Sequence, residues 1–166
     1  MTLDAMPSRR IVNFAGFAVC CGLMGFALFA QHVLLLDPCP LCVFQRVAVI
    51  SIGLIFLVAA LHNPSGAGRI VYSLLLALAA VAGAAVAARH AWLQQLPPDK
   101  VPSCGPGLDY MLETLPFTEM LSTVFKGSGE CAEIVWQFLG LSMPAWVFIW
   151  VTALGVTGVW NNLRRD

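Results

Sequence analysis

Two cysteines separated by two residues are the clearest chemical signal in this sequence. Cys39 and Cys42 belong to the stretch DPCPLC, residues 37–42. This C-x-x-C spacing lets two sulfurs form a small, exchangeable disulfide in which one sulfur can be stabilised as a thiolate. If a helix begins just after Cys42, its N-terminal dipole and Arg46 one turn later both favour the anionic sulfur. The pair is predicted to exchange disulfides, with a static disulfide or half of a zinc site as alternatives.

Two further cysteines lie in the polar part of the sequence. Cys104 is in the breaker-rich stretch PSCGPG (102–107), where an exposed cysteine can reach the disulfide of a partner protein, and Cys131 precedes an apolar run. Disulfide exchange proceeds by attack of a thiolate on a disulfide sulfur, through a mixed disulfide. Two cysteine pairs on adjacent loops would therefore form a relay. A single structural disulfide is the alternative for this second pair.

No metal site is predicted from these four cysteines. A structural zinc site usually combines one C-x-x-C with a second closely spaced pair. Cys104 and Cys131 have 26 residues between them and no histidine nearby. Two other cysteines, Cys20 and Cys21, lie within an apolar run, where a buried cysteine behaves as a small hydrophobic residue.

Arg46 and His90 are ionisable residues at the edges of apolar segments. An ionisable residue in a membrane span is costly and by default marks a function, although an arginine near a helix end can also snorkel to the interface. Arg46 follows Cys42 by four residues, so the two share a helix face and Arg46 lies one turn deeper. A lipid-soluble electron acceptor would meet the sulfur there. His90 is either a hydrogen-bond donor to such an acceptor or an interfacial side chain.

The composition places these residues in a membrane protein. Of 166 residues, 59% are hydrophobic and 11% are charged, with a mean hydropathy of +0.81, more apolar surface than a soluble domain of this size can bury. The formal net charge is zero and the basic residues are scattered. A nucleic-acid partner is therefore not expected, because no continuous basic surface is available to follow a phosphate backbone.

Four apolar runs are long enough to cross a bilayer, which takes about 20 residues per helix. They predict an all-α membrane protein with a four-transmembrane-helix bundle, formed by a single integral membrane domain over residues 1–166. The spans are expected at about 11–33, 43–62, 70–89 and 144–161, and the outer loops at about 34–42 and 90–143. Because residues 134–141 are also apolar, an earlier start of the last span is the alternative.

The long outer loop is predicted to carry a short interfacial helix. From Leu108 to Phe125, apolar residues recur at helical spacing with acidic residues elsewhere on the helical wheel. Such a pattern is typical of a helix that lies on the membrane surface. A small packed core within the loop is the alternative, and Pro116 is expected to break the helix.

The basic residues predict how the bundle is oriented. With four spans, both termini lie on one side, and every short loop or tail of that side is basic: Arg9, Arg10, Arg69, Arg164 and Arg165. By the positive-inside rule this side is cytoplasmic. All four outer cysteines then face an oxidising compartment, and seven of the nine acidic residues lie on the same side.

The order of these features resembles the disulfide bond formation protein B (DsbB) family over nearly the whole chain. The features are a basic N-terminus, a span, a C-x-x-C, an arginine four residues after its second cysteine, two spans joined by a short loop, a long outer loop with two widely spaced cysteines, and a last span. The resemblance implies a multi-pass protein of the bacterial inner membrane, with both termini cytoplasmic and the redox-active cysteines periplasmic. Gln45 is a departure, since relatives are expected to vary there and often to carry a charged residue.

The resemblance also implies a reaction cycle. A thioredoxin-like periplasmic oxidase of the DsbA type would deliver electrons, and a membrane quinone, either ubiquinone or menaquinone, would receive them. Cys104 would form the mixed disulfide with the partner, and Cys131 would be its disulfide mate and pair transiently with Cys39. Cys42 would then be freed as a thiolate against the quinone. Arg46 matches the quinone-site arginine of the family, and His90 matches a histidine near that site.

Three other functions fit parts of the pattern. One is a paralogous disulfide oxidase with a dedicated partner, or an enzyme of the vitamin K epoxide reductase type, although that type usually has its loop cysteines before its membrane C-x-x-C. Another is a non-enzymatic membrane protein that binds metal through its four outer cysteines. The third is electron flow in the opposite direction, because direction depends on reduction potentials that residue identity does not determine.

Overall fold

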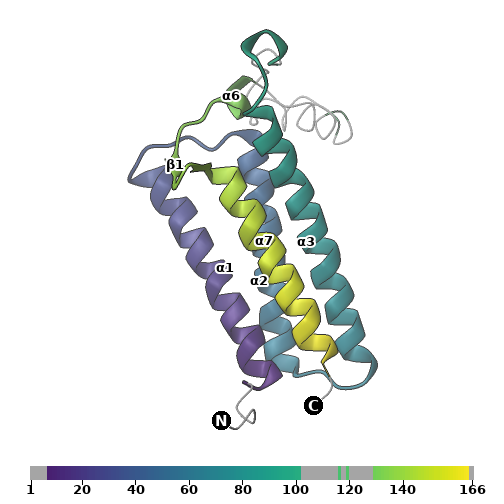
Figure 1. The fold of residues 1–166 in the computed structure, drawn as a ribbon. Coiled ribbons are helices and arrows are strands. Elements are labelled where there is room, and N and C mark those ends of the chain that lie inside the picture. Colours follow the sequence, from purple (N-terminus) through teal and green to yellow (C-terminus); the bar gives the residue numbers. More distant parts are fainter. Residues whose placement is uncertain (1–6, 102–115, 117–118, 120–128, 165–166) are drawn as a thin grey trace.

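A computed structural model describes residues 7–101, 116, 119 and 129–164 of the chain. Within this part, four long helices run side by side as a bundle (Figure 1): α1 (Arg9–His32), α2 (Pro40–His62), α3 (Ala67–Leu93) and α7 (Met143–Leu163). Each is long and apolar enough to cross a membrane. The predicted fold class, an all-α membrane bundle, is confirmed, and the chain is a multi-pass membrane protein.

The described chain ends lie together at one end of the bundle, called here the terminal end (Figure 1). The helices are delimited by local signals. The Ser8 hydroxyl caps α1 by accepting a hydrogen bond from the Ile11 N–H. At the α2–α3 turn, Asn63 ends α2 in the left-handed conformation, and Gly66 precedes α3 with φ +56° and ψ −129°. Residues with a side chain rarely adopt that backbone conformation, so glycine is the residue that suits it.

Small residues let the helices approach closely. Helix α3 packs along α7, α1 along α2, and α2 along α3. A Cβ atom at Gly155 of α7 would lie 2.4 Å from the Cβ of Ala80 on α3, closer than two non-bonded carbon atoms can approach. In lipid, where apolar side chains gain little by leaving the solvent, this kind of close packing drives helix association.

Three asparagines join α1 to α7 at the terminal end. Asn13 and Asn162 exchange two amide hydrogen bonds of 3.2 Å, and Asn161 donates a third to the Asn13 Oδ1 at 3.1 Å. All three side chains are buried. We call this group the asparagine cluster; its hydrogen bonds hold the two helices at a fixed separation, because breaking one would leave a buried amide without a partner.

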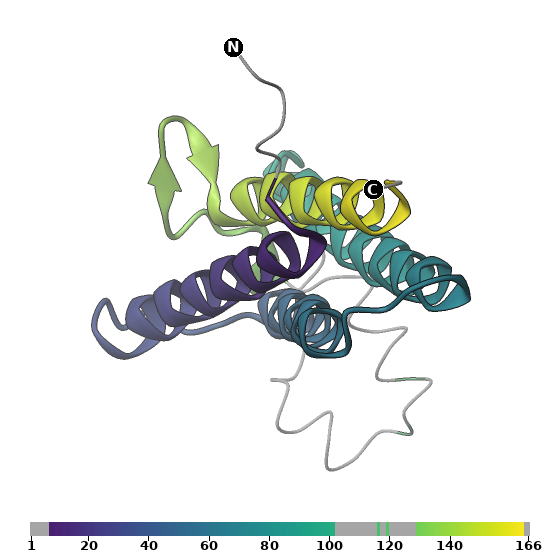
Figure 2. The same cartoon turned by 90° about the horizontal axis from the view of Figure 1, so that it is seen from below.

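The other end of the bundle, called here the cysteine end, is covered by short elements. They are the 3₁₀ turn η1 (Pro98–Lys100), the single-turn helix α6 (Gly129–Ala132), and the strands β1 (Gln137–Phe138) and β2 (Leu141–Ser142). The strands form an antiparallel hairpin in which Gln137 pairs with Ser142. Seen along the bundle, the hairpin lies at its outside, next to α7 (Figure 2).

The hairpin decides where the last long helix begins. The alternative of an earlier start, within residues 134–141, is wrong, because this run turns back on itself at Leu139 and Gly140. Both have positive φ, 53° and 79°, as a two-residue hairpin turn of type I′ requires. The surface helix predicted from Leu108 to Phe125 falls almost entirely outside the described residues.

The contact at Gly155 yields a stability prediction. Gly155→Ala is expected to lower the free energy of unfolding by about 1–3 kcal/mol, because α3 and α7 must move apart to admit the methyl group. Gly25→Ala on α1 is the matched control, since a Cβ there meets nothing within 4 Å. Thermal unfolding of both variants in detergent measures the difference. Equal stability of Gly155→Ala and wild type would contradict this account of the packing.

Candidate active site

The C-x-x-C motif forms the first turn of α2. Cys39 is the N-cap of the helix, and its Sγ accepts a hydrogen bond from the Cys42 backbone N–H at 3.3 Å. The helix begins at Pro40, so the predicted start after Cys42 is wrong. Proline fits the first helical position because the N–H it lacks would have no partner within the helix. Both cysteines therefore lie at the positive end of the helix dipole, with their sulfurs 2.8 Å apart.

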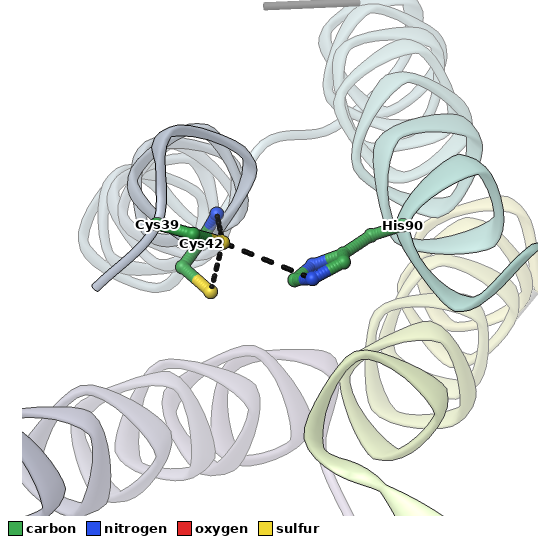
Figure 3. Close-up of side chains that lie close together, drawn as sticks. All are labelled: Cys39, Cys42 and His90. Atoms are coloured by element: carbon green, nitrogen blue, oxygen red, sulfur yellow. Dashed lines mark hydrogen bonds between the residues drawn. The ribbon is translucent and has the colours of Figure 1, made fainter. Parts of the chain in front are cut away.

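His90 of α3 reaches across to these sulfurs (Figure 3). Its Nε2 lies 3.8 Å from the Cys39 Sγ, and its Nδ1 lies 2.8 Å from the side-chain Nε2 of Gln45. With the Gln45 amide in this orientation, the amide donates to Nδ1, so the ring proton is on Nε2 and faces the sulfurs. His90 is 2% exposed and Gln45 4%. His90 is thus buried against the C-x-x-C and is not an interfacial side chain.

Cys131 completes the group of sulfurs. It is in α6, is 1% exposed, and packs in one apolar cluster with Cys39, Leu41 and Leu93. A hydrogen bond with Cys131 raises the pKa of the Cys39 thiol above its ordinary value, and a second with Cys42 and the burial of the thiol add to this shift. Cys39 therefore stays protonated at neutral pH when all three cysteines are reduced. Cys104 lies outside the described residues.

Arg46 lies one turn below Cys42 and is tied to α1. Its guanidinium donates hydrogen bonds to the side-chain oxygen of Gln31 and to the backbone carbonyl of Ala27, the latter at 3.1 Å. The side chain is only half-buried. Because both acceptors are uncharged, the positive charge of Arg46 stays available to a ligand beside it.

A cavity of about 480 Å³ opens beside these residues, between α1, α2, α7 and the hairpin. Three polar or reactive side chains of α2 form one part of its lining: Cys42, Gln45 and Arg46. The rest is mostly apolar, and its aromatic members are Phe26, Trp136, Phe138, Trp146 and Trp150. The combination of an apolar body and a few convergent polar groups is typical of a small-molecule site.

These five rings form the aromatic wall of the cavity; Phe138 belongs to the hairpin, and Trp136 directly precedes it. Trp136 stacks on Phe138 with ring centroids 6.1 Å apart and meets the ring of Phe26 on α1 edge to face at 5.5 Å. The indole N–H of Trp146 on α7 donates to the Phe138 carbonyl at 3.0 Å. The hairpin thereby links α1 to α7 across the mouth of the cavity.

A model of the family described as "Disulfide bond formation protein DsbB" matches residues 9–161. The chain belongs to the DsbB family. It is similar to three proteins named "Disulfide bond formation protein B". That of Marinobacter nauticus is 52% identical over 160 residues, covering 96% of this chain and 95% of the relative. That of Hahella chejuensis is 51% identical over 158 residues (95% and 94%), and that of Saccharophagus degradans is 48% identical over 165 residues (99% of each).

Membership confirms the resemblance seen in the sequence and makes this DsbB-family chain a membrane thiol–disulfide oxidoreductase. Of the predicted site residues, the structure brings together Cys39, Cys42, Cys131 and His90, and places Arg46 one turn away. Sequence reasoning gave no role to Gln45. The sign in the sequence was a polar residue about one turn after Cys42 within a mostly apolar run.

The raised pKa of Cys39 can be measured by alkylation. In fully reduced protein, Cys39 should react with iodoacetamide only at a more alkaline pH than an ordinary thiol, because the thiol form persists as pH rises. Cys131→Ala removes the largest cause and should move the pH midpoint of Cys39 alkylation downward. Mass spectrometry of the labelled peptide measures the midpoint. Cys20→Ala, in the middle of α1, should leave it unchanged, and an equal shift in both variants would contradict the assignment.

Proposed function

We propose that this chain oxidises a periplasmic thioredoxin-like dithiol oxidase of the DsbA type and passes the electrons to a membrane quinone, which sustains disulfide formation in the periplasm. The observation that carries the proposal is the position of Cys42. It belongs to the sulfur group that contains Cys131 and also lines the apolar cavity beside Arg46. One side of this site suits thiol exchange and the other suits a lipid-soluble acceptor.

The thiol side works by successive exchange. The reduced partner would attack Cys104 of a Cys104–Cys131 disulfide and form a mixed disulfide with it. The second thiol of the partner would then attack this mixed disulfide, so that the partner leaves in its oxidised form and both chain cysteines are reduced. Two electrons enter the chain in this step. The contact between Cys131 and Cys39 supports the next transfer, since attacking and attacked sulfurs must meet.

In that transfer, Cys131 would attack Cys39 of the Cys39–Cys42 disulfide, forming a Cys131–Cys39 bond and freeing Cys42 as a thiolate. Cys104 would then attack Cys131, restoring the loop disulfide and freeing Cys39. The structure favours Cys42 as the leaving sulfur. It lies in the first turn of α2, at the positive end of the helix dipole and near the Nε2–H of His90.

The cavity fits a quinone. A quinone is a flat apolar ring with two carbonyl acceptors and an apolar tail, and the cavity offers aromatic side chains, apolar helix surfaces and the guanidinium of Arg46 as a donor. Its volume of about 480 Å³ lies within the usual range for small-molecule sites, about 300–1,000 Å³. Arg46, Cys42 and the aromatic wall would hold the ring. When bound, the quinone would accept the two electrons released by the thiols.

The bundle orientation follows from its charges. The described basic residues of the terminal end are Arg9, Arg10, Arg69 and Arg164. By the positive-inside rule we assign this end to the cytoplasm, and hence the cysteine end to the periplasmic face of the inner membrane.

Turnover tests the proposal. Purified protein given a reduced DsbA-type oxidase should reduce a soluble quinone, followed by the change in quinone absorbance. Cys42→Ser and Cys104→Ser should abolish turnover, whereas Cys21→Ser, on the exposed face of α1, should not. Arg46→Ala should mainly raise the quinone KM, by about ten- to a hundredfold, the value of a hydrogen bond from a charged donor. Quinone reduction that is independent of both Cys42 and Cys104 would overturn the scheme.

Gln45 is expected to act by positioning His90. Gln45→Leu leaves Nδ1 of the buried imidazole without its partner, and turnover should fall by about tenfold or more because the ring no longer points at the sulfurs. Gln45→Glu can only accept from Nδ1 when ionised, so it draws the ring proton away from Nε2 and should not restore turnover. The pH profile of kcat should change in Gln45→Leu and not in Val47→Leu, a variant of an exposed side chain on the same helix. Unaltered kinetics of Gln45→Leu would refute the role.

A further inference from the structure

We infer that the reduced active site is also a zinc site, in which Cys39, Cys42, Cys131 and His90 bind one Zn²⁺ and so stop electron transfer. The inference deepens the proposed function, because it assigns an inhibitory ligand to the same residues. The proposed zinc ion binds reversibly to the reduced enzyme and is not a permanently bound metal.

The geometry of three of the ligands is close to that of a tetrahedral site. The ligand atoms of Cys39, Cys42 and His90 all lie within 4.8 Å of one another. With Zn–S bonds of about 2.3 Å and Zn–N bonds of about 2.0 Å, ligand atoms in such a site lie about 3.3–3.8 Å apart. The distance from the Cys39 Sγ to the His90 Nε2, 3.8 Å, already fits. The two sulfurs of the C-x-x-C, now 2.8 Å apart, need to separate by about 1 Å, a shift that side-chain rotation provides.

Cys131 would supply the fourth ligand after a shift of its thiol, because its sulfur is not among the three ligand atoms that now lie within 4.8 Å of one another. Its thiol contacts that of Cys39, and both belong to the same buried cluster. Three cysteines and one histidine are one of the usual ligand sets of structural zinc. The sequence alone gave no reason to expect this set, because His90 and Cys131 are 41 residues apart and neither is near the C-x-x-C along the chain.

Gln45 supports the histidine as a ligand. A metal-bound histidine usually uses its second ring nitrogen in a hydrogen bond that fixes the ring, and the Gln45 amide lies 2.8 Å from Nδ1. With zinc on Nε2, the neutral ring carries its proton on Nδ1. A half-turn of the amide then presents Oε1 as the acceptor. The same side chain can therefore serve both states of the ring.

The charges also permit the ion to bind. Three thiols lose their protons to solvent as Zn²⁺ binds, so the loaded site carries one net negative charge, and no electron moves. The guanidinium of Arg46 one helical turn away offsets that charge. Because a sulfur in a disulfide is not a thiolate donor, zinc and the redox bonds are mutually exclusive. The metal would capture only enzyme that has accepted electrons and has not yet been reoxidised.

Metal titration of the full-length protein in detergent tests the inference without quinone or partner. Reduced wild type should bind one equivalent of Co²⁺, used as a spectroscopic probe, with thiolate-to-cobalt charge-transfer and tetrahedral d–d absorption, and Zn²⁺ should displace it. His90→Gln and Cys131→Ala should each weaken binding by at least tenfold. Cys104→Ser and Cys20→Ala should bind like wild type. Thermal unfolding of each reduced variant checks that it is folded, and Cys131→Ser gives a second, more conservative variant at that position.

The outcomes separate the two proposals. Binding of Co²⁺ by reduced but not oxidised protein, with turnover blocked by Zn²⁺ and restored by a chelator, supports the zinc site. Absence of stoichiometric binding, binding that survives oxidation, or binding as tight as wild type in folded His90→Gln or Cys131→Ala would overturn it, even if quinone reduction proceeds. Conversely, a chain that binds the metal but never reduces quinone retains the zinc site and loses the proposed electron transfer.

Discussion

The hydrogen bond from the Cys42 backbone N–H to the Cys39 sulfur is the contact on which the site depends. It makes a cysteine the N-cap of α2 and lets the helix begin at Pro40. Because one turn of helix then separates Cys42 from Arg46, the reactive sulfur and the cation line the same cavity at successive depths. Had α2 begun a turn later, Cys39 would lie in the preceding loop, and its sulfur would not be held beside Cys42 by the first turn of the helix.

The rest of the bundle keeps this first turn in place. Helix α3 brings His90 to the sulfurs, and it can do so only because α3 is held close to α2 and α7 by small residues such as Gly83 and Gly155. The outer segments then close the end: α6 presents Cys131, and the hairpin segment adds Trp136 and Phe138 to the aromatic wall. Among the described residues, the reactive side chains thus gather at one end, and between the two ends the helices are apolar enough for lipid, where an unpaired polar group would be costly.

The bundle could be predicted from the sequence because four apolar runs leave few alternatives in a membrane. The C-x-x-C and Arg46 could be found because their relation is local: four residues along one helix determine a shared face. Cys131 and His90 could be named as site residues, but their contact with the C-x-x-C depends on how distant segments fold over the helix end. The hairpin shows the same limit. Residues 134–141 are apolar like a span, and only the positive φ angles at Leu139 and Gly140 distinguish a turn from a helix.

Gln45 illustrates a different reason for a missed residue. Its side chain has no chemistry of its own, and its importance comes from a bond to His90, 45 residues away. Burial in an apolar helix was the available sign, since a polar side chain there requires a partner. Which partner it has is a property of helix packing, which periodicity does not contain.

The asparagine cluster affects how the width of the cavity depends on the angle between α1 and α7. It joins α1 to α7 at the end opposite the cavity, so a change in the angle between these two helices about the cluster would be largest at the cavity. Along α1 the distance from Asn13 to Ala27, at the cavity, is about 21 Å at 1.5 Å per residue. A tilt of about 3° about the cluster therefore changes the width of the cavity by about 1 Å. Because α1 packs along α2 and Arg46 of α2 donates hydrogen bonds to Gln31 and Ala27 of α1, such a tilt would also shift the contacts of Arg46 beside the cavity.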